Sequence, residues 1–183
     1  MLTITEKKLT FHFPETWQVN QYDKPGFYRR KVHQCQGTGA VDILALSEEK
    51  GLFLIEVKDF RGYRIENKTR FKNGELSIEV SQKVRDTLIG LYGAYRCQET
   101  VLAPFCDYLF AHSKLTKDAR YKRKMTAILF LEEDILPVRY ENPKQVHEEL
   151  RHRIQIQLKF LQVRSNVHNK ETFYQKLGIQ VTG

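Results

Sequence analysis

The stretch AVDILALSEEKGLFLIEVKDF, residues 40–60, decides the fold. It contains two short apolar runs, residues 41–46 and residues 52–57, of the kind that form buried strands. The polar segment between them, residues 47–51, ends in glycine and is typical of a turn. Because strands joined by so short a turn pair with each other, the stretch predicts a buried β-hairpin.

Three charged residues interrupt this apolar hairpin. Asp42 lies near the start of the first strand, and Glu56 and Lys58 lie at the end of the second. A charge in a buried strand carries a large desolvation penalty unless it is paired or binds a metal ion. Residues i and i+2 of a strand point to the same face, so Glu56 and Lys58 are neighbours. The hairpin is therefore predicted to bring Asp42 toward a carboxylate–lysine pair.

The segments outside the hairpin predict further strands and an insertion. Residues 9–13 alternate apolar and polar residues, as a half-buried strand does, and residues 27–35 also fit a strand. The continuous apolar run at residues 125–131 predicts a buried strand. An Asn-Gly pair tolerates the backbone of a tight turn, so residues 61–80 are predicted to form a β-hairpin insertion.

Helical periodicity marks three more segments. Behind a predicted N-cap at Ser81, apolar residues recur at helical spacing through residues 82–98. Pro143 suits the first turn of a second, long helix, and residues 171–177 fit a short third one. Together with the strands, these helices predict an α/β fold in which a central β-sheet is flanked by helices.

Length and composition narrow the class of protein. At 183 residues the chain is predicted to be a single domain. Its 30 basic and 22 acidic residues leave a net charge of +8, which fits a polyanionic partner such as nucleic acid. The three cysteines lack the spacing of a zinc site or a disulfide framework, which favours the cytoplasm. No apolar run has the length of a membrane span, so no membrane partner is expected.

The charged hairpin also predicts a metal site. Two converging carboxylates, Asp42 and Glu56, repel each other unless a cation lies between them. Carboxylate oxygens, with room left for water and phosphate, are the ligands that Mg²⁺ prefers. Lys58 beside them would orient an attacking water or offset charge on a phosphate. In the structural alternative, Glu56 and Lys58 form a pair at a sheet edge and Asp42 caps a turn.

These residues resemble the signature of the PD-(D/E)XK nuclease superfamily, which has the restriction-endonuclease-like fold. Val-Asp at residues 41–42 corresponds to the PD element, with valine in place of proline, and Glu-Val-Lys at residues 56–58 corresponds to the (D/E)XK element. The resemblance covers about residues 40–98. It implies one nuclease-like domain with a central mixed β-sheet, whose core spans about residues 27–163 and carries the hairpin insertion.

The resemblance implies phosphodiester hydrolysis by a metal-dependent nuclease, with a DNA endonuclease favoured. Asp42 and Glu56 would bind Mg²⁺, for which Mn²⁺ would substitute, together with the backbone carbonyl of Val57. Lys58 would assist the attacking water. Gln82, at the start of the helix that follows, would also contact the site.

Some implications of the resemblance stay open. The family's first helix is expected within residues 14–23, where Glu15 and Asp23 are candidate acidic ligands. Because the chain has little room for a sequence-recognition domain, specificity would come from a homodimer or a partner protein. The alternative functions are a catalytically silent module that binds nucleic acid and a subunit active only within a defence or repair complex.

Basic residues outside the hairpin are the candidate contacts with nucleic acid. Lys83 and Arg85 lie at the start of the helix predicted after the insertion, where they are candidates for phosphate contact. The run at residues 114–124 holds six basic residues and one acidic residue, so it would neutralise phosphates and make binding depend on salt. The alternative for this run is a solvated connector. Its candidate contacts are Lys117, Arg120, Lys122, Arg123 and Lys124.

Overall fold

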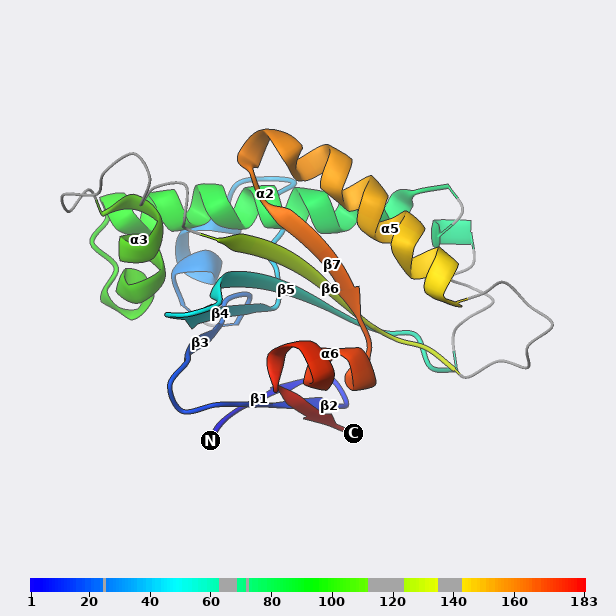
Figure 1. The fold of residues 1–183 in the computed structure, drawn as a ribbon. Helices are drawn as coiled ribbons and strands as arrows, with labels where there is room; N and C mark the ends of the chain where they lie inside the picture. Colours follow the sequence, from blue (N-terminus) through cyan, green and yellow to red (C-terminus); the bar gives the residue numbers. More distant parts are fainter. Residues whose placement is uncertain (25, 63–68, 72, 112–123, 135–142) are drawn as a thin grey trace.

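The fold described below is that of a computed structural model of the chain. The structure describes residues 1–24, 26–62, 69–71, 73–111, 124–134 and 143–183. The prediction of an α/β fold with a sheet flanked by helices is confirmed (Figure 1). Among the helices in these ranges, none is both long enough and apolar enough to cross a membrane.

A mixed five-stranded sheet forms the centre of the fold. Its strand order is β3-β4-β5-β6-β7, with antiparallel pairing from β3 to β5 and parallel pairing from β5 to β7. A parallel pair needs a long crossover, and the chain from β5 to β6 makes it with helices. The strands are β3 (Gln18–Gln21), β4 (Ile43–Ser47), β5 (Gly51–Asp59), β6 (Met125–Glu132) and β7 (Arg164–His168).

The predicted hairpin is confirmed, and its register sets the position of the charges. β4 and β5 pair antiparallel from Ile43↔Ile55 to Ser47↔Gly51. Asp42 lies one residue before β4 begins, while β5 continues past the last paired residue to Asp59. The end of β5 therefore extends beyond β4, on the side where Asp42 lies. The buried strand predicted at residues 125–131 and the strand at residues 9–13 are also confirmed.

Helices cover one face of the sheet. In Figure 1, α2 and α5 cross this face and α3 packs at one end. Leu52 and Leu54 of β5 contact this helical layer, and the helices contribute apolar residues at intervals of four, such as Leu76 and Val80. The helices are α2 (Glu75–Arg96), α3 (Ala103–Phe110) and α5 (Pro143–Leu158), with the short helical turns η2 (Thr100–Leu102) and η3 (Lys159–Leu161).

A second layer covers the opposite face. The alternate residues of β5, such as Phe53 and Ile55, pack there against a three-stranded antiparallel sheet of order β1-β2-β8 and against one helix (Figure 1). Because successive side chains of a strand point to opposite faces, β5 takes part in both cores. The elements of this layer are β1 (Leu2–Glu6), β2 (Leu9–Phe13), α6 (Lys170–Leu177) and β8 (Gln180–Thr182).

The β-hairpin predicted for residues 61–80 is wrong where the structure describes it. Residues 75–80 form the first turns of α2, and residues 69–71 are also helical. Gly74 does adopt a positive φ of 81°, but there it is the N-cap of α2, and Asn73 Oδ1 accepts a hydrogen bond from the Glu75 N–H. Positive φ serves a helix start as well as a hairpin turn, so the Asn-Gly pair did not discriminate between them.

One helix boundary and two whole elements also differ from the prediction. Ser81 is no N-cap, because it lies inside α2 and its hydroxyl donates to the Ser77 carbonyl. The strand predicted at residues 27–35 is replaced by η1 (Tyr28–Val32), a helical turn of the π type. The helix expected within residues 14–23 is replaced by strand β3, which pairs with β4. The helices predicted at residue 143 and at residues 171–177 are confirmed.

Candidate functional site

Asp42 lies just before the start of β4, an inner strand of the central sheet, and its side chain is held by the backbone of β5. Its side chain is buried, and the Val57 N–H donates a hydrogen bond of 2.6 Å to Asp42 Oδ2. In an extended strand the N–H and C=O of one residue point to the same side, so the Val57 carbonyl faces the side of β5 on which Asp42 lies. The hairpin thus brings Asp42 and the Val57 backbone together, as predicted.

Helix α2 fixes the segment that leads into Asp42. The Gly39 N–H donates to Asp86 Oδ2 at 3.0 Å, and the Val41 N–H donates to Thr87 Oγ1 at 3.0 Å. Asp86 and Thr87 are both buried. These contacts satisfy backbone groups that precede the first paired residue of β4, and they set the position of Asp42 relative to α2.

Glu56 is the most deeply buried carboxylate of the site. It is 1% exposed, and its Oε1 atom lies 2.6 Å from Lys83 Nζ and 2.8 Å from Lys58 Nζ. Its other oxygen, Oε2, is buried and has no hydrogen-bond partner among the described residues. A buried carboxylate oxygen without a partner carries a desolvation penalty that a cation would remove.

Lys58 joins β5 to α2. Its ammonium lies between Glu56 Oε1 and Glu79 Oε1, 2.7 Å from the second, and its side chain is only 12% exposed. Burial works against the charged form, but the carboxylates of Glu56 and Glu79 outweigh it and raise the pKa of Lys58 above its usual value. Burial also opposes charge on Glu79, but Lys58, Lys83 and Arg70 lower the pKa of Glu79 below its usual value. Both groups are therefore charged at neutral pH.

Unlike the pKa of Glu79, the pKa of Asp42 is raised above its usual value. Burial, followed by the charge of Glu56, raises the pKa of Asp42 to about 7. The hydrogen bond from Val57 and the charge of Lys83 lower this pKa, but they do not compensate. Asp42 and Glu56 therefore repel each other, as two carboxylates near one cation site would.

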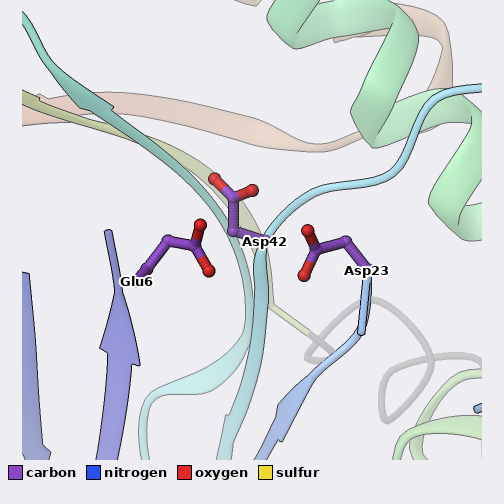
Figure 2. A group of neighbouring side chains, drawn as sticks. All are labelled: Glu6, Asp23 and Asp42. Carbon is purple, nitrogen blue, oxygen red and sulfur yellow. The ribbon is translucent and has the colours of Figure 1, made fainter. Parts of the chain in front are cut away.

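Two further carboxylates approach Asp42 from the N-terminal part of the chain. Figure 2 shows Glu6 and Asp23 extending toward Asp42 from opposite sides. One oxygen of each carboxylate lies within 4.8 Å of the others. Lys24 Nζ forms an ion pair of 3.0 Å with Glu6 Oε2 and lies 3.9 Å from Asp23 Oδ2. Glu6 comes from the last residue of β1, so the small sheet contributes to this acidic cluster.

The donor set of this site fits a divalent cation that prefers oxygen. Asp42 and Glu56 supply carboxylates, and the Val57 carbonyl faces the side of β5 on which Asp42 lies. Mg²⁺ and Mn²⁺ bind such oxygens and keep part of their water shell. The buried Glu56 Oε2 atom, which lacks a protein partner in the part of the chain described, is the group that such a cation would satisfy.

The structure brings together part of the predicted site. Asp42, Glu56, Val57 and Lys58 meet at the end of the hairpin, and Lys83 binds Glu56 instead of facing solvent. The other predicted residues lie elsewhere. Gln82 is exposed, Arg85 is exposed and paired with Asp86, and Lys124 is exposed just before β6 begins. The remaining predicted contacts fall outside the described residues: Lys117, Arg120, Lys122 and Arg123. Of the two candidate acidic ligands, Asp23 joins the cluster and Glu15 pairs with the N-terminal ammonium.

Sequence reasoning missed Glu79 and Glu6. Glu79 and Lys83 are four residues apart on α2, a spacing that places both on one helix face and could have revealed Glu79. The hairpin predicted for residues 61–80 concealed this signal. Glu6 is brought to the site by the pairing of β1 with β2, and no local pattern near it marks a ligand.

Gly39 is expected to be required for the position of Lys83. A Cβ atom at Gly39 would lie 2.9 Å from Lys83 Cγ, closer than real contacts allow, and this atom is near the fixed end of the side chain. Gly39→Ala should therefore displace Lys83 and lower the free energy of unfolding by about 1–2 kcal/mol. Urea unfolding at neutral pH measures this effect.

The matched control for this prediction is Gly93→Ala on α2. A Cβ atom at Gly93 would make ordinary contacts of 3.7 and 3.8 Å with Phe27. Alanine is favoured over glycine inside a helix, so this variant should keep or raise the stability by up to about 1 kcal/mol. Equal destabilisation by both substitutions would contradict a special role for the approach of Gly39 to Lys83.

Comparison with known proteins finds a partial similarity. The chain is 33% identical over 120 residues to the cysteine–tRNA ligase of Neisseria meningitidis serogroup A / serotype 4A (strain DSM 15465 / Z2491). The match covers 51% of this chain and 17% of the ligase, so the chain spans about a sixth of the length of that protein. No protein-family model and no solved structure matches the chain. The similarity covers too little of the ligase to place the chain in its family.

Proposed function

We propose that the chain is a divalent-cation-dependent nuclease of the PD-(D/E)XK type that hydrolyses phosphodiester bonds. The observation that carries the proposal is Glu56, which is 1% exposed and has a buried oxygen without a hydrogen-bond partner among the residues described. Asp42, a second buried carboxylate, lies beside it, and the repulsion between the two negative charges favours a cation between them. Charged groups placed in this way tend to mark functional sites.

The order of elements supports a restriction-endonuclease-like core. Strands β3, β4 and β5 are followed by α2 and then by β6, which pairs parallel to β5. A PD-(D/E)XK core has a helix, three strands, a second helix and a further strand, so the order from β3 to β6 supports the proposal. The family's first helix would precede those strands, and this chain has the strands β1 and β2 there instead. The proposal therefore rests on the hairpin and α2, where the charged residues lie.

The residues of the chain divide the work of phosphodiester hydrolysis. A divalent cation held by Asp42, Glu56 and the Val57 carbonyl would offset charge on the phosphate and lower the pKa of an attacking water. Lys58 is fixed between Glu56 and Glu79, so its ammonium is held at the edge of the site. From there it donates hydrogen bonds to the attacking water or to a phosphate oxygen as negative charge grows.

The proposed substrate is nucleic acid, with DNA favoured. The proposed compartment is the cytoplasm. The net charge of +8 supports a polyanionic substrate. The similarity to a cysteine–tRNA ligase makes tRNA a second substrate to test. A catalytically silent binding module would have the same net positive charge but no turnover. A subunit that needs a homodimer or a partner protein would show no turnover as an isolated chain.

The deciding experiment is a cleavage assay on single- and double-stranded DNA, RNA and tRNA with Mg²⁺ or Mn²⁺. We expect cleavage that EDTA abolishes and that Lys58→Ala lowers about 10²-fold. The control is Lys50→Ala, an exposed lysine in the turn between β4 and β5 that donates to the Leu177 carbonyl. Binding without cleavage would support the silent module. Cleavage that Lys58→Ala leaves unchanged would contradict the proposed site.

A further inference from the structure

Lys83 pairs with the same carboxylate that a divalent cation would require. Its ammonium donates to Glu56 Oε1 at 2.6 Å, and Glu56 is the carboxylate to which the proposed function assigns the cation. The same Oε1 atom also receives Lys58 at 2.8 Å. One buried oxygen is thus shared by two ammonium groups, while Oε2 has no hydrogen-bond partner in the described part of the chain.

A second carboxylate lies within reach of the Lys83 ammonium. Glu79 is one helical turn before Lys83 on α2, and its Oε1 atom is 4.0 Å from Lys83 Nζ. The stem of Lys83 is confined, because Gly39 leaves no room for even a Cβ atom next to Lys83 Cγ. The end of the side chain can therefore move from Glu56 to Glu79 while its base stays in place.

The positive charge around Glu56 makes the position at Glu79 the more favourable one for Lys83 once a cation binds. Lys58 and Lys83 already place two ammonium groups against Glu56 Oε1. A divalent cation bound to Glu56 adds two positive charges beside these ammonium groups in a poorly solvated site. Like charges repel strongly there, because little water is present to screen them.

We propose that Lys83 is a displaceable counter-ion that competes with the divalent cation for Glu56. When a cation binds to Glu56, the Lys83 ammonium moves to Glu79 and becomes available to a phosphate of the substrate. Lys83 is then a positioning residue that sets the affinity for the cation. The inference depends on the proposed metal site, but not on the identity of the nucleic acid.

The test is the affinity for Mn²⁺, measured by calorimetry on the full chain, without substrate. Lys83→Met removes the competing charge and should bind Mn²⁺ about 10-fold more tightly than the wild type. The control Lys50→Met removes the same charge from the turn between β4 and β5 and should leave the affinity within about twofold. Unchanged or weaker binding by Lys83→Met would overturn the inference.

A double-mutant cycle tests the movement to Glu79. Glu79→Gln removes the second position of the ammonium and should weaken Mn²⁺ binding about threefold in the wild type, but not in the Lys83→Met background. The same loss in both backgrounds would show that Glu79 acts independently of Lys83 and would contradict the movement. Failure of the wild type to bind Mn²⁺ would instead overturn the proposed metal site itself.

A second measurement serves if Lys83→Met does not fold. The side-chain NMR signals of the lysines in the wild type, assigned with Lys83→Arg, are followed during addition of Mg²⁺. The Lys83 signal should shift with the same concentration dependence as cation binding, whereas the exposed Lys50 signal should stay constant. A Lys83 signal that does not respond while the cation binds would overturn the inference.

Discussion

Asp42→Asn is expected to abolish metal-dependent cleavage and, without divalent cations, to stabilise the protein at alkaline pH. Loss of a carboxylate ligand should lower cleavage by at least about 10²-fold. The amide oxygen of asparagine can still accept the hydrogen bond that Val57 donates to Asp42 Oδ2 at 2.6 Å. The variant therefore loses the charge while it keeps the backbone contact, which separates an effect on cleavage from one on folding.

The gain in stability follows from the raised pKa of Asp42. Burial and the charge of Glu56 raise this pKa to about 7, above its value in the unfolded chain. The folded state then binds the proton more tightly, so the contribution to stability is complete below about pH 4 and is lost as the pH rises toward 7. The loss amounts to up to about 4 kcal/mol, and asparagine does not titrate.

Urea unfolding in EDTA at pH 5.5 and pH 8 measures this effect. The stability of the wild type should fall between these pH values more than that of Asp42→Asn, and the variant should be the more stable of the two at pH 8. Asp107→Asn on α3 replaces an exposed aspartate and should follow the wild type. Parallel pH profiles for the wild type and Asp42→Asn would contradict the buried, repelled state of Asp42.

Phe130→Ala is expected to have the largest effect on stability. Phe130, in β6, is fully buried between the central sheet and the small sheet. Its ring packs edge-on against Phe11 and Phe173, with centroids 4.9 and 5.3 Å away. Removal of a buried phenylalanine ring leaves a cavity and costs about 3–5 kcal/mol, which lowers the melting temperature by about 6–20 °C in a chain of this size.

Thermal unfolding followed by circular dichroism checks this prediction. Phe160→Ala is the matched control, because this phenylalanine in η3 is 73% exposed. It should change the stability by no more than about 0.5 kcal/mol. If the two variants melted at the same temperature, the layer formed by the small sheet and α6 would not pack on β6 as described.

The central hairpin could be predicted from sequence because its signals are local. Residues 41–46 and 52–57 are apolar runs separated by a short polar turn, and the structure pairs them antiparallel as a hairpin. The i,i+2 relation placed Glu56 and Lys58 on one face, and their ammonium–carboxylate contact of 2.8 Å agrees. Strand alternation alone was therefore sufficient for the centre of the site.

The errors came from features that local patterns do not determine. An Asn-Gly pair suits both a tight hairpin turn and a helix N-cap, and tertiary packing of Leu76 and Val80 selected the helix. Gln82 was chosen because the resemblance implies a contact from the start of this helix, but it is Lys83 that contacts Glu56. Adjacent helix positions differ by about 100° around the axis, so an error of one residue changes the face.

The small sheet could not be predicted from local sequence patterns, because two of its paired strands are far apart in the chain. Strand β2 pairs with β8, whose residues are near the other end of the sequence. The packing of this small sheet and α6 on the central sheet brings Glu6 to Asp42 and Phe173 to Phe130, although no short segment encodes either contact. The acidic cluster at Asp42 was therefore only partly foreseeable, through Asp23.

Because alternate residues of β5 pack in two different cores, the sequence of β5 also selects the register in which the hairpin pairs. A shift of one residue would exchange the two faces of the strand and move Glu56 and Lys58 toward the layer that contains Phe130. There they would lose Glu79 and Lys83, their partners on α2, and two ions would be buried among aromatic rings. The charges that form the candidate site thus also penalise misaligned hairpins during folding.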